Sequence, residues 1–252
     1  MKSTDNRSRR FIFGKNPVLE ALKSDQEVTE VWIEKSSNKK LEQISQMCIE
    51  SKIPCFFKDS TELENLEQDY HQGIIAFLGE SKNLYYSIEQ FFSKSAPKPP
   101  YFFIILDSIT DPRNFGAIIR NCDHFNITGV LFSQDRSAQI SPLVYKASSG
   151  AAHFVPLIQV KNLSRAMSWM KKQNIWIYGL DVTGDSFLPQ VQFSGDIALV
   201  LGSEEKGMRR LVKESCDHLI KIENIGHVDS LNVSVASGIA MYEVLKQRSK
   251  NA

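Results

Sequence analysis

Runs of apolar residues alternate with amphipathic segments along most of this chain. In the C-terminal part, apolar runs at residues 101–106, 128–132, 175–180, 197–201 and 218–222 predict strands, the first of them covered on both faces. The segments at 114–124, 142–149, 163–173, 209–216 and 233–248 predict helices. This alternation predicts an α/β fold in which helices cover both faces of a mostly parallel sheet.

The first 80 residues repeat this alternation on a smaller scale. Strands are predicted at 28–34, 54–58 and 73–78, and helices at 39–51 and 61–67, after a first helix with Asn16 as its N-cap and Pro17 at its first position. We therefore predict a small α/β domain at 11–80. The segment 81–99 is rich in proline and small residues near its end, which favours an extended linker to a larger domain at 100–252.

Composition and charge limit the classes of protein to which this chain can belong. The chain has 252 residues, of which 42% are hydrophobic, and a formal net charge of +1, so its overall charge does not indicate a polyanionic partner. Residues 1–10 carry four basic side chains against one acidic one, which predicts a flexible basic arm that contacts phosphate or is simply solvated. We expect no membrane segment, because no apolar run approaches about 20 residues. The four cysteines form no CxxC pair, so we expect reduced thiols, a cytoplasmic location and no metal site.

Polar segments follow three of the predicted strands, at the sheet edge where open α/β folds bind ligands. The first, 107–120, contains Asn114, which can cap a helix, and Arg120, whose apolar neighbours suggest either a structural ion pair or an anion partner. The second is Gly202-Ser-Glu-Glu-Lys-Gly207, which is not a P-loop because methionine and arginine follow where that motif requires lysine and serine or threonine.

The third segment, 222–240, runs from a strand into the last helix. Ser230 or Asn232 can cap that helix, which is rich in serine, alanine and glycine. Small side chains allow another backbone to approach closely. We therefore expect this helix to pack tightly against a neighbouring element or a second subunit.

In their order and spacing, the three segments resemble the signature motifs of the SpoU (TrmH) family of RNA 2′-O-ribose methyltransferases. The resemblance covers about residues 103–248, and residues 11–80 resemble the family's N-terminal RNA-binding domain of ribosomal-protein-like fold. It implies a SPOUT α/β domain with a deep C-terminal trefoil knot, S-adenosylmethionine as methyl donor, and a homodimer formed through the knot region. The two-domain layout is most similar to members that methylate a guanosine ribose of 23S ribosomal RNA.

The resemblance also implies roles for single residues. The implied cofactor contacts are Gly202, Ile222 and Leu231, and the implied catalytic residues are Asn114, Arg120, Glu204, Ser230 and Asn232. Family proposals make the arginine a base, but a guanidinium stays protonated. We expect Arg120 instead to grip the substrate phosphate and stabilise developing negative charge, and Glu204 to orient Arg120 or Asn114.

Other functions remain open at this point. A relative acting on transfer RNA or another ribosomal RNA would carry the same motifs. A non-catalytic RNA-binding ribosome-assembly factor would be expected to have lost some of the catalytic residues, and none is missing. The loop at 223–229 departs from the family pattern by two extra carboxylates and a histidine beside the implied cofactor site.

Overall fold

The computed structural model describes residues 9–36, 41–67, 71–79 and 84–250. The chain divides into two compact units, Met1–Asn83 with Ile140–Phe154, and Leu84–Gln139 with Val155–Ala252. Most of the predicted basic arm lies outside the described residues. Its described end is not free, because Arg9 forms an ion pair with Glu30 at 2.9 Å. None of the helices in the described ranges is long and apolar enough to cross a membrane.

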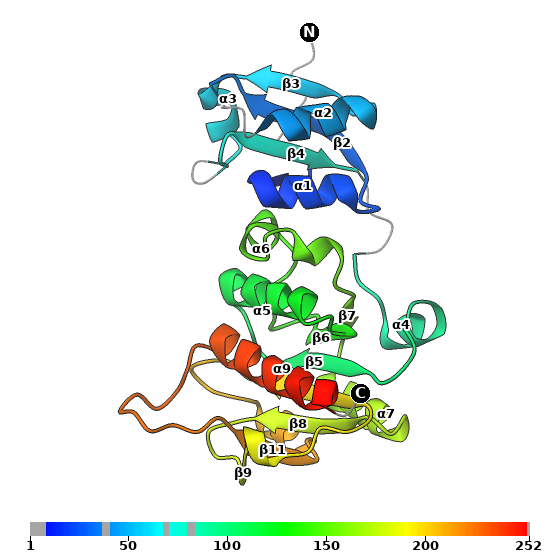
Figure 1. Ribbon diagram of the computed structural model, residues 1–252, viewed down its shortest axis with the longest axis vertical. Coiled ribbons are helices and arrows are strands. Elements are labelled where there is room, and N and C mark those ends of the chain that lie inside the picture. The colour runs from blue at the N-terminus through cyan, green and yellow to red at the C-terminus, as the bar shows by residue number, and fades with distance from the viewer. Residues whose placement is uncertain (1–8, 37–40, 68–70, 80–83, 251–252) are drawn as a thin grey trace. The chain divides into compact units, whose positions relative to one another are not determined.

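The first unit contains a four-stranded sheet in the order β1-β4-β2-β3, of which Figure 1 labels β2, β3 and β4. Its strands are β1 (Phe11–Phe13), β2 (Val28–Glu34), β3 (Cys55–Lys58) and β4 (Ile74–Leu78), and its helices are α1 (Lys15–Lys23), α2 (Glu42–Glu50), α3 (Ser60–Glu64) and α6 (Pro142–Ala147), followed by a short 3-10 helix at Ala151–His153. All five residues of β4 are buried, as expected for a strand paired on both sides.

The start of α1 corrects one expectation. The N-cap is Gly14, with φ of 93°, and not Asn16, which is the second residue of the helix. Because glycine adopts positive φ without strain, the chain turns earlier than predicted, and the Gly14 carbonyl accepts the first helical hydrogen bond from Val18 N at 3.2 Å.

The second unit is built on a seven-stranded sheet in the order β7-β6-β5-β10-β8-β11-β9. Every pairing in it is parallel, which confirms the predicted sheet type. The strands are β5 (Phe102–Leu106), β6 (Gly129–Ser133), β7 (Leu157–Val160), β8 (Trp176–Leu180), β9 (Ser186–Phe187), β10 (Ile197–Leu201) and β11 (His218–Lys221). The strands β5, β6 and β10 are buried along their whole length, and the sequences of β5 and β10 are unbroken apolar runs.

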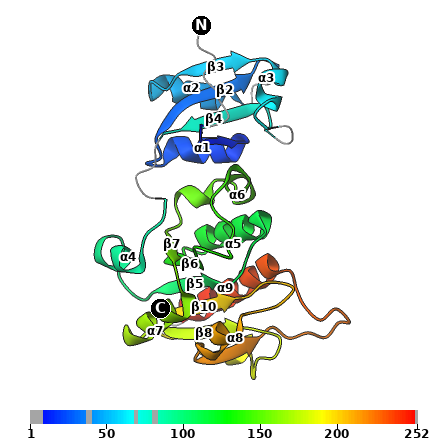
Figure 2. The same ribbon diagram turned by 180° about the vertical axis from the view of Figure 1, so that it is seen from behind.

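Helices cover both faces of this sheet. They are α4 (Ile88–Lys94), α5 (Pro112–His124), α7 (Leu163–Lys172), α8 (Arg210–Glu214) and α9 (Val233–Lys250), with a short 3-10 helix at Leu188–Gln190. Figures 1 and 2 show α9 on one face of the sheet and α8 on the other. The last helix packs against α5.

The segment predicted as an extended linker contains the helix α4. Ser87 and Gln90 form a capping box, in which Ser87 Oγ accepts from Gln90 N at 3.2 Å and Gln90 Oε1 accepts from Ser87 N at 3.0 Å. Phe91 of this helix is fully buried in the core of the second unit. The capped start and this buried ring explain why the segment is helical where its later prolines suggested an extended chain.

Candidate active site

The register of the central strands brings two of the three predicted segments to one edge. Leu106 of β5 pairs with Leu201 of β10, and Leu201 pairs with Leu180 of β8. The segments that begin at Asp107 and Gly202 therefore leave the sheet side by side, and Asp107 N donates to Leu201 O at 2.9 Å.

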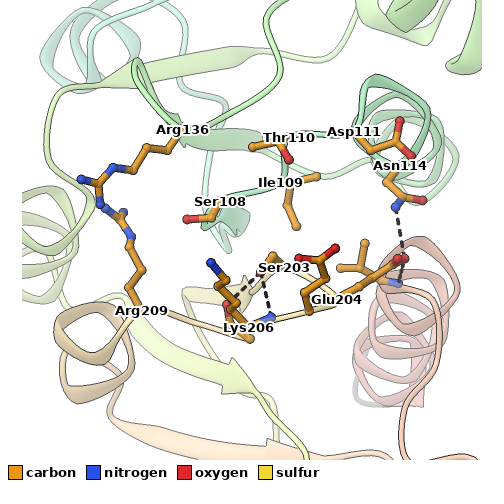
Figure 3. A pocket seen from close by; sticks show the side chains of 13 residues that line it. Ser108, Ile109, Thr110, Asp111, Asn114, Arg136, Ser203, Glu204, Lys206 and Arg209 are labelled. Carbon is orange, nitrogen blue, oxygen red and sulfur yellow. Dashed lines mark hydrogen bonds between the residues drawn. The ribbon is translucent and has the colours of Figure 1, made fainter.

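Three of the predicted catalytic side chains meet in one hydrogen-bonded cluster. Asn114 Nδ2 donates to Glu204 Oε1 at 3.1 Å, and Asn232 Nδ2 donates both to that same oxygen and to Asn114 Oδ1, the latter at 3.0 Å. The backbone N–H of Val233 also donates to Glu204 Oε1, at 3.1 Å. The cluster thus joins α5, the loop after β10 and the start of α9, and Figure 3 shows the bond between Asn114 and Glu204.

Helix capping explains how the two asparagines become available. Asn114 is not the cap of α5, because Asp111 takes that place by accepting from Arg113 N at 2.9 Å. The amide of Asn114, in the first turn of the helix, is therefore free to bond Glu204. Asn232 does cap α9: its Oδ1 accepts from the N–H groups of Ser234 at 3.0 Å and Val235 at 3.4 Å.

Glu204 is the centre of the cluster. Its carboxylate accepts from both asparagine amides and from the first N–H group of α9, at the positive end of that helix dipole. The expectation that Glu204 orients Asn114 agrees with this geometry. Orientation of Arg120 by Glu204 does not, since no contact joins the two side chains in the described parts of the chain.

Arg120 is the predicted site residue that the structure keeps apart from the others. It is exposed on α5 and lines neither of the two cavities beside the cluster. Among the described residues it has no ion-pair partner, so the structural ion pair considered from the sequence is absent there. Its guanidinium is left open to solvent.

Two cavities share the loop 203–207. The first, of about 640 Å³, is lined by Asn114 and Glu204 together with polar and basic side chains (Figure 3). The second, of about 720 Å³, lies between the ends of β8, β10 and β11, and its lining includes Gly202, Ile222, Ser230 and Leu231. Ser230 is exposed and lines this second cavity, outside the hydrogen-bonded cluster.

The loop 202–207 needs glycine for a reason that the sequence did not reveal. A Cβ on Gly202 would lie 2.3 Å from Gly207 C and Met208 N, because the loop folds back on itself. Two backbone hydrogen bonds close this turn, from Ser203 N to Gly207 O at 3.1 Å and from Gly207 N to Ser203 O at 2.8 Å. Close approach of the chain's own backbone, and not only of a ligand, therefore excludes a side chain at Gly202.

Sequence reasoning missed one ion pair beside the cluster. Asp107, fully buried at the end of β5, accepts from Arg209 Nε at 2.6 Å and from Arg209 N at 2.7 Å. The partners lie 102 positions apart, and only their places after adjacent strands could have suggested the pair. Arg136, which follows β6 and lines the first cavity, was missed as well.

The small residues of α9 have a clear structural role. Asn121 of α5 donates from Nδ2 to Ser234 O at 2.9 Å and to Ser237 Oγ at 3.1 Å. A Cβ on Gly238 would lie 3.3 Å from the same Nδ2 atom. Tight packing against a neighbouring element, one of the two predicted explanations, is therefore confirmed.

Family models match both parts of the chain. The model described as the SpoU rRNA Methylase family matches residues 101–242, and the one described as RNA 2′-O ribose methyltransferase substrate binding matches residues 11–84. The first alone covers more than half of the chain. The chain belongs to the SpoU methylase family.

Individual relatives agree with this assignment. A 23S rRNA (guanosine-2′-O-)-methyltransferase RlmB from Coxiella burnetii is 43% identical over 192 residues, which is 76% of each chain. The Escherichia coli K12 protein of the same name is 44% identical over 71% of this chain and 73% of its own. A putative TrmH family tRNA/rRNA methyltransferase, YacO of Bacillus subtilis, is 35% identical over 95% of this chain and 96% of its own.

Solved structures show the same fold. The SpoU methyltransferase AviRb from Streptomyces viridochromogenes, solved in complex with AdoMet, has a TM-score of 0.79 at 20% identity, over 95% of this chain and 90% of its own. A crystal structure of an RNA 2′-O ribose methyltransferase has a TM-score of 0.82 at 22% identity, over 97% and 91% of the two chains.

As a SpoU methylase, the chain is an RNA 2′-O-methyltransferase that uses S-adenosylmethionine. The second cavity fits such a cofactor in volume, since pockets for ligands of this size span about 300–1,000 Å³. Its chemistry fits too. In the described structure no backbone-to-backbone hydrogen bond involves residues 223–231, so many amide and carbonyl groups of this loop are available to a ligand.

Proposed function

We propose that this SpoU methylase transfers a methyl group to the ribose 2′-oxygen of a guanosine in 23S ribosomal RNA. One structural observation carries the proposal: Asn114, Glu204 and Asn232 form a single cluster beside a cavity of cofactor size. The target follows from the relatives, because those from Coxiella burnetii and Escherichia coli carry the name 23S rRNA guanosine methyltransferase.

The cluster suits the needs of this reaction. Bound S-adenosylmethionine would supply an electrophilic methyl group, and the ribose hydroxyl must be aligned with it while its proton leaves. Asn114 and Asn232 present amide groups whose orientation Glu204 fixes, so they would position the hydroxyl. Arg120, exposed and without a carboxylate partner in the described residues, would bind an RNA phosphate and stabilise negative charge on oxygen, and Ser230 would assist from the cavity rim.

Gly202, Ile222 and Leu231 are the proposed cofactor contacts. All three line the larger cavity, and each belongs to a segment that leaves a strand end or enters α9. Contacts through backbone groups fit the open loop 223–231, where the chain leaves its amides unpaired by other backbone atoms.

A trefoil knot in the C-terminal chain belongs to the proposal. The strand β11 lies beyond β8, on the far side from β5, and the chain then returns past the loop 203–207 to reach α5 through α9. This path is the kind that a threaded chain would take. An experimental structure of the protein tests this prediction, because its backbone trace, with the two ends joined, is either knotted or unknotted. An unknotted trace would refute the knot.

A homodimer is proposed through the outer surface of α9. Val235, Ile239 and Tyr242 are 51%, 40% and 58% exposed, and their spacing of four and three residues places them on one side of the helix. A second copy of the chain would cover this apolar stripe, while the opposite side of α9 already contacts α5.

The proposed domains are residues 11–80 for RNA binding and 100–252 for methyl transfer. The substrate-binding model over residues 11–84 supports the first of them. A ribosomal RNA substrate further supports a cytoplasmic location.

The decisive experiment maps ribose methylation in RNA from cells with and without the gene. We expect one guanosine of 23S rRNA to lose its 2′-O-methyl group, and purified protein to restore it on unmodified 23S rRNA with S-adenosylmethionine. Loss of a methyl group from transfer RNA instead would favour the activity named for the Bacillus subtilis relative. An unchanged methylation map, together with no cofactor binding by calorimetry, would favour a non-catalytic assembly factor.

Two variants test the role of Arg120. Arg120→Lys keeps a positive charge and is expected to retain measurable turnover, whereas Arg120→Ala is expected to lose it. Equal and complete loss in both variants would contradict simple charge stabilisation.

A further inference from the structure

The smaller cavity carries basic side chains that the proposed function has not used. Arg136, Lys206 and Arg209 line it together with Asn114 and Glu204. In Figure 3 the side chains of Arg136 and Arg209 point toward one another on one side of the cavity, and Asn114 lies on the other side. Two guanidinium groups directed at the same space repel each other unless an anion lies between them.

Hydrogen bonds to Asp107 fix the position of Arg209 in the cavity lining. Buried Asp107 accepts hydrogen bonds from the backbone N and from Nε of this residue, at 2.7 and 2.6 Å. These bonds leave both Nη groups unused within the described residues, and the side chain of Arg209 is 37% exposed. Because a guanidinium can bind two oxygens at once, the free Nη groups form half of an anion site.

The backbone of Arg136 is held in an unusual conformation. Its φ is 71°, in the left-handed region, which typically costs about 1 kcal/mol or more for a residue with a side chain. Hydrogen bonds fix this turn, from Ser133 Oγ to Asp135 O at 3.2 Å and from Ala138 N to Ile109 O at 2.8 Å. The turn places Arg136 in the cavity lining, where it has no carboxylate partner among the described residues.

Glu204 and Asp111, two carboxylates of the cavity lining, lie on the side of Asn114, away from this pair (Figure 3). Glu204 already accepts three hydrogen bonds in the asparagine cluster, and Asp111 caps α5. Glu205 and Lys206 are adjacent on the loop and offset each other in charge. The buried Asp107 balances the charge of Arg209, whereas Arg136 has no carboxylate partner among the described residues.

We propose that Arg136 and Arg209 bind a phosphodiester group of the RNA substrate, adjacent to the ribose that Asn114 and Asn232 position. This inference rests on the proposed function for the identity of the ligand. The cavity reaches from Arg136 to Asn114, so one occupant can contact both the arginine pair and the cluster. The arginine pair would fix the RNA backbone, and the amide cluster would then align the hydroxyl.

Arg136→Ala is the primary test, because Arg209 also supports the fold through Asp107 and its replacement would disturb both. The probe is a mixed-sequence oligoribonucleotide, whose binding to the full-length protein is measured by fluorescence anisotropy at several salt concentrations. We expect Arg136→Ala to weaken RNA binding about tenfold, and to reduce the slope of log K against log[salt] by about 0.7–0.9. Arg136→Lys should restore the slope but only part of the affinity.

Arg165→Ala is the matched control. Arg165 is an exposed arginine of α7 that lines neither cavity, so its loss should leave RNA affinity and the salt slope near those of the parent protein. In steady-state methylation of unmodified 23S rRNA, Arg136→Ala should raise KM for RNA more than it lowers kcat.

Calorimetry with S-adenosylmethionine separates the two sources of an anion. An unchanged cofactor Kd in Arg136→Ala, with weakened RNA binding, supports the phosphodiester site. A weakened cofactor Kd with normal RNA binding would show that the pair holds the cofactor carboxylate and would overturn the inference, as would equal RNA binding in all variants. If RNA binding depends on Arg136 but 23S rRNA is not methylated, the proposed substrate fails while the phosphate site stands.

Discussion

Replacing Glu204 with alanine is the sharpest test of the proposed catalytic cluster. The change removes one oxygen atom that accepts from Asn114 Nδ2 at 3.1 Å, from Asn232 Nδ2, and from Val233 N at 3.1 Å. No other side chain in the described residues accepts from both asparagines. The variant should therefore remove the acceptor that both amides share, and only the bond from Asn232 Nδ2 to Asn114 Oδ1 would still join the two asparagines.

The structure predicts a small effect on stability and a large one on rate. Glu204 is exposed, so water can replace most of its hydrogen bonds, and the loss of negative charge at the start of α9 adds about 0.3–1 kcal/mol. We expect the free energy of unfolding to fall by about 1–2 kcal/mol. Misplacement of the positioning groups by about 1 Å lowers kcat on the order of 100-fold.

The assay is transfer of a labelled methyl group to unmodified 23S rRNA at saturating cofactor and RNA. Glu204→Gln keeps an acceptor oxygen and should fall between Glu204→Ala and the parent protein. Glu89→Ala, at an exposed position of α4 that lines neither cavity, serves as control and should stay close to the parent rate. The cofactor Kd should change little in any of them.

A double-mutant cycle supplies the result that would refute this reasoning. If Glu204 acts by holding Asn114, then Asn114→Ala combined with Glu204→Ala should lose hardly more activity than either change alone. A coupling energy of about 2.7 kcal/mol corresponds to full overlap of two 100-fold effects. Independent, multiplicative losses would show that Glu204 contributes to the reaction by another route.

Three further outcomes test other parts of the structure. Hydrogen bonding from the Cys48 thiol lowers the pKa of Cys55 to about 7. Alkylation of Cys55, followed by mass spectrometry, should therefore rise with pH around a midpoint near 7. Cys48→Ala should move that midpoint up toward about 8.5. Asp107→Asn, which weakens an ion pair whose carboxylate is fully buried, should lower the free energy of unfolding by about 2–3 kcal/mol and Tm by about 5–10 °C in calorimetry; an unchanged Tm would contradict the pair's role. Ile239→Asp should convert the proposed dimer to a monomer in light scattering, whereas Ile49→Asp, at an exposed site on α2, should not.

Much of the fold was predictable because its central strands are unbroken apolar runs. The strands β5 and β10 stood out in the sequence, since burial on both faces leaves no polar positions. The strands that sequence reasoning missed, β1, β7 and β9, have two to four residues each and lie at sheet edges, where burial constrains the sequence less. Such short segments carry too few positions to show a period.

The candidate site was predictable in part. Asn114, Glu204 and Asn232 follow or lie near strand ends, and that common position predicted a shared edge. The conformation of Arg136 was not predictable, because nothing in the sequence marks a left-handed residue in a turn closed by distant contacts. The pair of Asp107 and Arg209 depends in the same way on which strands are neighbours, and strand order is a tertiary property.

The loop after β10 connects the two sides of the smaller cavity. It carries Glu204, which bonds Asn114 of α5, and it ends at Arg209, which bonds Asp107 at the end of β5. Both anchors on the other side thus belong to the segment that follows β5, the strand paired with β10 along its whole length. The register of these two buried strands therefore sets the separation between the amide cluster and Arg209, and β6, paired with β5, positions Arg136. A ribose hydroxyl and its neighbouring phosphate have a nearly fixed separation of their own, so a rigid scaffold of this kind is what simultaneous recognition of both groups requires.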